Sequence, residues 1–141
     1  MLVMLLPEQL TDYWMAFEGH VERSMPPLAS EYADANQVLF SLMMGSSQCW
    51  VLMDQKQEVK GFIITTTLLD ISGVRTLIIY CAVIFDKTMS VDWKAELETM
   101  KKYAASRECV KLASFVANEK IIKALEAFGA DTRFTFVTLG L

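Results

Sequence analysis

The sequence has few of the residues that build metal, redox and phosphate sites. Its 141 residues include one histidine and three cysteines, so no His/Cys cluster with metal-ligand spacing is present. The cysteines Cys49, Cys81 and Cys109 lie far apart, each beside apolar residues. This pattern predicts buried, reduced thiols in an intracellular protein rather than a disulfide framework. The six glycines are isolated from one another, which excludes a P-loop and a Rossmann glycine fingerprint.

Positive charge is also scarce. The chain has thirteen Lys and Arg residues and seventeen Asp and Glu residues, which gives a formal net charge of −4. Nucleic-acid binding therefore has no global electrostatic basis, and no nucleic-acid partner is predicted. The basic residues near position 100 interleave with Glu96, Glu98 and Glu108, which is typical of a solvated helix face.

No apolar run approaches the roughly 18 residues that a membrane span needs, so no membrane partner is predicted. The opening Met1–Leu6 run lacks a basic leader and a small-residue cleavage site, and Pro7 ends it early. We interpret it as a short first strand. Apolar residues nevertheless make up 53% of the chain, including nine methionines. This surplus favours a domain that associates with another protein surface.

Hydrophobic periodicity predicts one domain over residues 1–141, in the order β-α-α-β-β-β-α-β-α-β. The fold class is α/β (α+β), with a mixed, mostly antiparallel central sheet flanked by helices. We expect the third strand of the meander, residues 75–85, to be buried on both faces and therefore central in its sheet, because it is almost continuously apolar. The other predicted strands are 1–6, 49–53, 59–69, 110–116 and 132–139. The first two predicted helices are 7–23 and 30–44, the second with Ser30 as its N-cap. The third is capped by Ser90 or Asp92 and has an apolar stripe of Trp93, Leu97, Met100 and Ala104. The fourth is 118–127.

The element order resembles the GNAT (acetyltransferase-like) fold. The best local match is Asn118 followed eleven residues later by Gly129. In the family, that Asn contacts the pantetheine arm of the cofactor or the helix start, and the Gly closes the helix. Ala130 stands where the family has an aromatic residue.

The family's cofactor loop binds the pyrophosphate of acetyl-CoA through an Arg/Gln-x-x-Gly-x-Gly/Ala motif, whose glycines let backbone N–H groups approach the phosphates. The corresponding loop here, residues 85–93, has no glycine and carries Asp86 and Asp92. If acetyl-CoA binds at all, the resemblance assigns its contacts to Lys87, Thr88, Ser90 and Asn118. The preferred expectation is that no cofactor binds.

A proton donor and a general base are also missing from their expected places. Leu125 occupies the position of the family's general-acid tyrosine, and a leucine cannot transfer a proton. Tyr80 and Tyr103 are interpreted as packing residues. The helix 7–23 carries an apolar stripe at Leu10, Tyr13, Trp14, Phe17 and Val21. The lone histidine, His20, is one position off this stripe and is interpreted as a surface or helix-contact residue. The turn carboxylates Glu58 and Asp70 are interpreted as solvated. No catalytic residue and no metal ligand is therefore assigned.

A narrower resemblance is to short acetyltransferase-like proteins of tailed bacteriophages. It rests on the runs 42–52 and 61–65, on Trp93 and Ala104, and on the Phe128-Gly129 end of the last helix. It implies a phage-encoded structural or assembly protein, located in the host cytoplasm or, if it is virion-associated, in the virion.

The helix 30–44 carries apolar residues on more than one face, which favours coverage by another chain. The predicted partner interface is Leu39, Phe40, Met43 and Met44. The leading hypothesis is a non-catalytic acetyltransferase-like domain that acts through protein–protein contacts, with a protein partner or as a homo-oligomer. The alternative is an acyl-CoA-dependent N-acyltransferase with a divergent cofactor loop. A third hypothesis is a small inhibitor of a host enzyme.

Overall fold

A five-stranded sheet organises the chain, and the computed structural model describes residues 1–29 and 33–141 around it. The strand order is β1-β2-β3-β4-β5, antiparallel throughout except for the parallel β4–β5 pair. This confirms the predicted mixed, mostly antiparallel sheet. The elements are β1 (Leu2–Met4), a 3-10 turn (Pro7–Gln9), α1 (Leu10–Arg23), α2 (Ala35–Met43), β2 (Ser47–Met53), β3 (Val59–Leu69), β4 (Arg75–Ile84), α3 (Trp93–Ser106), β5 (Lys111–Ser114) and α4 (Glu119–Ala127).

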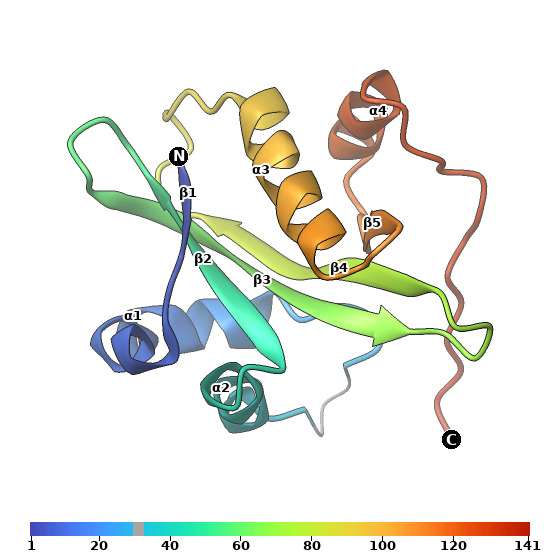
Figure 1. Ribbon diagram of the computed structural model, residues 1–141, viewed down its shortest axis with the longest axis horizontal. Coiled ribbons are helices and arrows are strands. Elements are labelled where there is room, and N and C mark those ends of the chain that lie inside the picture. The colour runs from blue at the N-terminus through green and yellow to red at the C-terminus, as the bar shows by residue number, and fades with distance from the viewer. Residues whose placement is uncertain (30–32) are drawn as a thin grey trace.

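Helices cover both faces of this sheet (Figure 1). Helices α1 and α2 lie on one face, and α3 and α4 lie on the other. The apolar stripe of α1 is buried as its spacing predicts, and Phe17 stacks on Phe62 of β3 with ring centroids 4.3 Å apart. Stacked rings of this kind add to the burial of apolar area. The core of this face consists chiefly of Leu10, Trp14, Phe17, Val21, Leu42, Val51, Phe62 and Ile64.

The second face is smaller and is built around Trp50 and Met100. Met100 of α3 packs with Trp50, Leu52 and Ile63 of the sheet, and Leu2 joins them. The rings of Tyr103 and Trp50 meet in a T-shaped arrangement, with 5.1 Å between their centroids. Tyr103 is therefore a packing residue here, as its place beside the helix stripe indicates.

Helix α3 differs from its predicted pattern at three residues. Glu96 is buried rather than part of a solvated face, because it accepts a hydrogen bond from the Leu2 N–H. Trp93, assigned to the buried stripe, is 40% exposed at the first turn. An i,i+4 ion pair of Glu98 with Lys102 is also expected from the sequence, but Glu98 pairs with Lys101 instead, at 2.9 Å.

The second helix is shorter than predicted. It begins at Ala35, because the side chain of Asp34 accepts the Asn36 N–H and caps it. The predicted cap Ser30 lies outside the described residues. The predicted cap of α3 at Asp92 is confirmed, since its side chain accepts the Ala95 N–H.

The third meander strand, β4, is not the central strand and is not buried on both faces. The centre is β3, and only Thr76, Leu77 and Cys81 of β4 are buried. Apolar composition overstated its burial, since Ile78 and Ile79 are only partly buried even where β5 pairs with the strand. β5 covers Lys111–Ser114, within the predicted 110–116.

The predicted closing strand 132–139 is absent. The chain after Gly129 runs without regular structure, and Phe134, Val137 and Leu139 are each more than three-quarters exposed. The alternating pattern is compatible with a strand, but a strand also needs a partner edge, and this segment pairs with none in the described structure.

Burial of the three cysteines is confirmed. Cys49, Cys81 and Cys109 are free thiols, and all three are buried. Within residues 1–29 and 33–141, no helix has the length and apolarity to cross a bilayer.

Candidate functional site

The expected cofactor region begins where β4 and β5 part. The two strands pair from Thr76–Lys111 to Ile79–Ser114 and no further. Beyond this point β4 continues beside β3 without β5, and the chain after β5 turns into α4. The register with β3 shifts at the same place, so that Tyr80 lies in a bulge. Parallel strands end at the same edge of a sheet, so the loop after β4 and the start of α4 face the same end of the molecule.

The loop after β4 is closed by its own aspartate. One side-chain oxygen of Asp86 accepts the Thr88 N–H at 3.0 Å and the Thr88 hydroxyl at 2.6 Å. These bonds lower the pKa of the Asp86 carboxyl, with the hydroxyl contributing most, so the group is charged at neutral pH. The backbone N–H of Met89 is also satisfied, by the Asp86 carbonyl oxygen at 3.2 Å. The Thr88 hydroxyl thus donates to a carboxylate instead of to a ligand.

The N-terminus of α3 carries a second internal carboxylate. Asp92 Oδ1 accepts the Ala95 N–H at 3.2 Å, and the Asp92 carbonyl oxygen accepts the Glu96 N–H at 3.1 Å. The positive end of a helix dipole is where a phosphate group binds best. Here a side chain of the protein already occupies part of that position.

More negative charge lies at the same end of the sheet, in the β2–β3 turn. Lys60 Nζ lies 3.0 Å from Glu58 and 3.9 Å from Asp54, and the Phe85 N–H donates to the Lys60 carbonyl oxygen. The Glu58 hydrogen bond, and then the charges of Glu58, Asp54 and Asp86, raise the pKa of Lys60. This lysine therefore neutralises carboxylates of the protein.

The structure groups three of the four predicted cofactor contacts. Lys87, Thr88 and Ser90 are exposed in one loop. Asn118 lies after the neighbouring strand, and its Oδ1 accepts the Lys120 N–H at 2.9 Å, which makes it the N-cap of α4. Its helix-capping role is confirmed. Contact of any of the four with a cofactor stays a prediction.

His20 also lies in this region, although the spacing of residues in the sequence did not predict that it would. Its ring lies 4.9 Å from that of Phe85, the residue at the start of the loop. Phe85 also approaches Phe17 and Phe62, both at 5.9 Å, so α1 supports the loop through aromatic contacts. His20 Nδ1 pairs with Arg23 at 3.3 Å. His20 is not part of the apolar stripe formed by Tyr13, Phe17 and Val21, which are four residues apart. Its position beside the loop after β4 therefore follows only from the packing of α1 in the fold.

Tyr80 and Tyr103 each pack against one of the two cores of the sheet. Tyr80 packs against the α1-side core, and burial is the main reason that its pKa is raised. Leu125, at the family's tyrosine position, is half-buried on α4. No group of three or more His, Cys, Asp or Glu side chains able to hold a metal is found in the described part of the chain.

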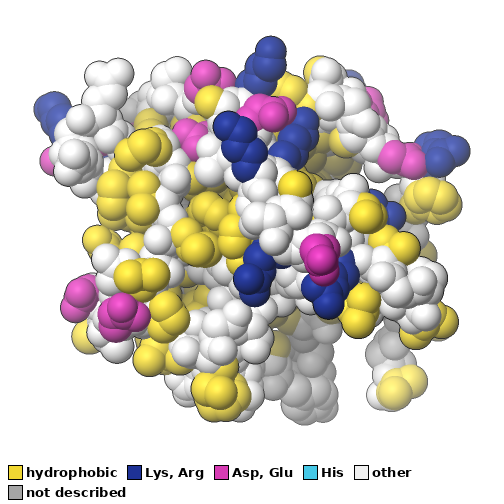
Figure 2. All heavy atoms as spheres, viewed as in Figure 1, with side chains coloured by type: hydrophobic (Ala, Val, Ile, Leu, Met, Phe, Trp, Pro, Cys, Tyr) yellow, Lys and Arg dark blue, Asp and Glu magenta, His cyan; other side chains and the backbone are white. Residues whose placement is uncertain are grey.

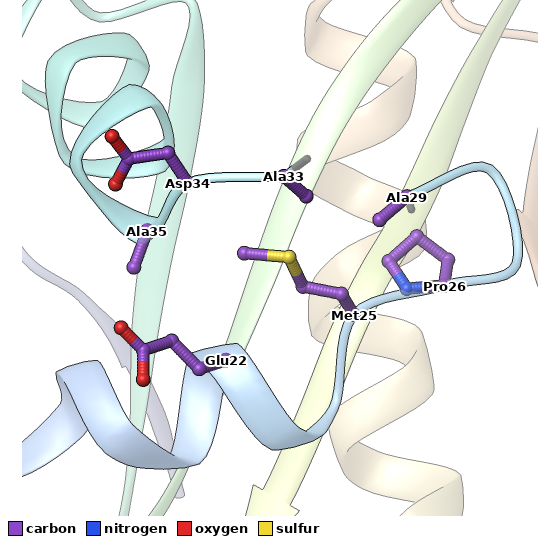
Figure 3. Close-up of a pocket in the computed structure, with 7 residues that line it drawn as sticks. All are labelled: Glu22, Met25, Pro26, Ala29, Ala33, Asp34 and Ala35. Atoms are coloured by element: carbon purple, nitrogen blue, oxygen red, sulfur yellow. The ribbon is translucent and has the colours of Figure 1, made fainter. Parts of the chain in front are cut away.

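Two surface hollows occur at other places. One, of about 460 Å³, lies between the end of α1 and the start of α2 and is drawn in Figure 3. Met25 points across it, and Glu22 and Asp34 border it on one side. It adjoins the segment outside the described residues, so no site is assigned to it. The other, of about 470 Å³, lies between Arg75, Arg107 and Glu108, where Arg75 already pairs with Glu108 at 3.6 Å.

Comparison with solved structures identifies the architecture. The chain aligns over its full length with a ribosomal-protein-alanine N-acetyltransferase from Brucella melitensis biovar Abortus 2308, covering 99% of that chain at 14% identity and a TM-score of 0.67. It also aligns over its full length with an aminoglycoside acetyltransferase from an uncultured soil metagenomic sample, covering 97% of that chain at 14% identity and a TM-score of 0.71. A third match is an acetyltransferase of Trypanosoma brucei, of which 99% is covered at 16% identity and a TM-score of 0.66. The chain has the GNAT acetyltransferase fold. No protein-family model and no curated protein sequence matches it.

The GNAT resemblance expected from element order is therefore confirmed at the level of the fold. Identities of 12 to 18% are too low to transfer an activity. The narrower resemblance to phage proteins stays a prediction.

Three of the four predicted partner residues are exposed on the GNAT scaffold. Phe40, Met43 and Met44 of α2 and its C-cap have 62%, 43% and 66% of their surface accessible. Leu39 is partly buried against the α1-side core. The exposed surface is narrower than the sequence indicates, because one side of α2 packs on the sheet.

Proposed function

We propose that this chain is a GNAT-fold domain that acts through protein–protein contacts and does not use acyl-CoA. The observation that carries the proposal is the pair of internal carboxylates, Asp86 and Asp92, which accept the N–H groups of Thr88 and Ala95. A diphosphate placed at this loop would compete with both for backbone donors and would meet their negative charge. The exposed Phe40, Met43 and Met44 supply an adaptable apolar surface for a partner. A phage or virion setting is the part of this proposal that rests on the sequence resemblance alone.

Isothermal titration calorimetry with acetyl-CoA tests the cofactor half of the proposal. We expect no saturable heat up to millimolar ligand, while a GNAT enzyme run in parallel gives a normal isotherm. Saturable micromolar binding that Lys87→Ala weakens would refute the proposal. The test variant Asp86→Asn keeps a side-chain oxygen acceptor and removes the negative charge. Its control, Glu58→Gln, makes the same change in the adjoining β2–β3 turn. Any gain in affinity should be larger for Asp86→Asn.

The α2 surface is tested with a separate variant. Phe40→Glu places a charge in the middle of the exposed apolar group, whereas Gln37→Glu adds the same charge one turn earlier on the same helix, next to the group rather than within it. Complexes that the chain forms through α2 should be lost in the first variant and kept in the second. Equal loss or equal retention would remove α2 as the interface.

The second candidate function is an N-acyltransferase with a divergent loop. It is favoured by the full-length alignment with acetyltransferases. In that case acetyl-CoA would contact Lys87, Thr88, Ser90 and Asn118. An acyl-transfer assay over a panel of amines tests it, and Lys87→Ala should lower the rate if the loop holds the cofactor. Absence of turnover with every amine, together with a flat titration, would leave the first proposal in place.

A further inference from the structure

The last part of the chain exposes a strand-like segment that pairs with nothing in the described structure. From Phe134 to Leu141 it has no charged residue and no proline, and it alternates large apolar and small polar side chains at Phe134, Thr135 and Phe136. Phe134 is 85% exposed and Leu139 is 89% exposed. Hydrophobic side chains line the right-hand side of the molecule in Figure 2, where this segment runs in Figure 1. An uncharged, β-prone, exposed segment is an aggregation hazard unless another strand covers it.

The same chain also presents a free sheet edge. β5 is the last strand of the sheet and pairs only with β4, so the backbone groups on its outer side have no strand partner among the described residues. The segment comes close to this edge without pairing with it. The edge of one ring meets the face of the other between Phe136 and Phe115, the residue that follows β5, at 5.0 Å between centroids.

The neighbouring helix has an apolar face that is equally uncovered. No residue of α4 is buried, although Ile121, Ile122 and Leu125 line one side of it. Ile121 is 51% exposed and Phe128 is 47% exposed. The free edge, the unpaired segment and this helix face are contiguous along the chain, from β5 onward.

We propose that residues 132–139 of each chain add as a strand to the free edge of β5 in a second copy. Each copy carries one unpaired segment and one unpaired β5 edge. In a twofold dimer the segment of each copy therefore pairs with the β5 edge of the other, and no segment or edge is left without a partner. Eight residues in extended form span roughly 26 Å, more than enough to cover β5 and the residues that follow it. The exchange also brings apolar side chains of the partner segment over α4. The proposal is independent of the proposed function, because it involves neither the 85–93 loop nor α2.

Sedimentation equilibrium on the full chain is the first measurement, and it should give a dimer at micromolar concentration. Two proline variants then test the strand. Thr135→Pro and Thr138→Pro each remove one backbone N–H, and because the two residues are three apart, one of these groups must point toward the paired edge. We expect at least one variant to sediment as a monomer. Thr135→Ser and Thr138→Ser keep the N–H groups and should remain dimers.

Two further variants distinguish strand exchange from association through a different surface. A chain ending at Ala130 should be monomeric, with the circular dichroism of the folded sheet retained. Phe40→Glu should leave the dimer intact, because α2 takes no part in the exchange. A monomeric wild-type chain, or a dimer that survives both proline variants, would overturn the proposal. If the shortened chain does not fold, the proline variants still decide.

Discussion

The carboxylate of Glu96, in the first turn of α3, accepts a hydrogen bond from the backbone N–H of Leu2 in β1 at 2.9 Å. Its other oxygen lies 3.1 Å from the amino group of Met1. β1 is a three-residue edge strand, and this contact fastens it to a helix 94 positions away in the chain. The bond lies in the core of the second face, where a lost partner cannot be replaced easily by water.

Glu96→Ala should therefore destabilise the protein more than the same substitution at an exposed glutamate of α3. The substitution leaves the Leu2 N–H without its acceptor, which costs about 1–3 kcal/mol for a buried group. Urea unfolding followed by circular dichroism measures this loss. Glu98→Ala, on the exposed side of the same helix, is the matched control and should unfold close to the wild-type midpoint. Equal effects of the two variants would show that the Leu2 contact adds nothing.

A second prediction concerns a buried side-chain relay in the sheet. The Trp50 indole N–H donates to the Thr65 hydroxyl at 3.0 Å, and that hydroxyl donates to Gln48 Oε1 at 3.0 Å. Thr65→Val keeps the shape of the side chain but leaves the indole N–H unpaired, at a cost of about 1–3 kcal/mol.

The control for this relay is Thr66→Val, one residue along β3. The Thr66 hydroxyl makes only a long bond to the Ser46 carbonyl oxygen, at 3.4 Å. Chemical denaturation of both variants should show a clearly larger loss for Thr65→Val. A loss no larger than that of Thr66→Val would mean that the relay contributes no net stability.

Local patterns predicted those parts of the fold that depend on one element alone. The α1 stripe ending at Phe17 and Val21 follows from its spacing, and the cap at Asp92 follows from residue type. The start of α2 differs from the predicted one, because the side chain of Asp34 caps the helix and only Ser30 was expected to do so.

Properties that depend on two distant segments could not be predicted in this way. Glu96 has the sequence pattern of an ordinary first-turn carboxylate, and only the docking of β1 buries it. Residues 132–139 have the alternation of a strand, but alternation does not say which edge will pair with it. The internal bond of the candidate loop is local and has the spacing of an Asx turn, but the sequence was interpreted only in terms of a cofactor contact for Thr88 and a charge for Asp86.

Gly61 supplies a third prediction, from close contact between strand backbones. A Cβ added at Gly61 would overlap the Val83 carbonyl oxygen, so β3 and β4 would have to separate. Gly61→Ala should therefore be strongly destabilising, by more than about 2 kcal/mol, as for other strained core substitutions.

Gly19→Ala is the opposite case and the control. Its added methyl would meet only the flexible end of Arg23, at 3.3 Å, and in mid-helix alanine is favoured over glycine by about 0.8–1 kcal/mol. Thermal unfolding should lower the midpoint for Gly61→Ala and raise it for Gly19→Ala. The same sign for both would contradict the assigned strand contact.

The final prediction concerns the pH dependence set by two buried thiols. Burial is the main reason that the pKa of Cys49 is raised to about 12 and that of Cys81 to about 11, with each well above the ordinary value of 9.0. Between about pH 9 and pH 11 the unfolded chain loses both thiol protons while the folded chain keeps them. The free energy of unfolding should therefore fall as pH rises through this range, by up to about 1.4 kcal/mol per pH unit for each thiol.

Thiol titration with an aromatic disulfide reagent checks the same groups directly. In a Cys109→Ser background near pH 8, the folded chain should react slowly at both remaining cysteines, because almost no thiolate is present and the side chains are inaccessible. Addition of denaturant should release two equivalents at once. Replacing Cys49 with alanine as well should reduce the alkaline slope of the unfolding free energy, which separates these thiols from the tyrosines and lysines that titrate nearby. An unchanged slope would show that the Cys49 thiol titrates alike in the folded and unfolded chains.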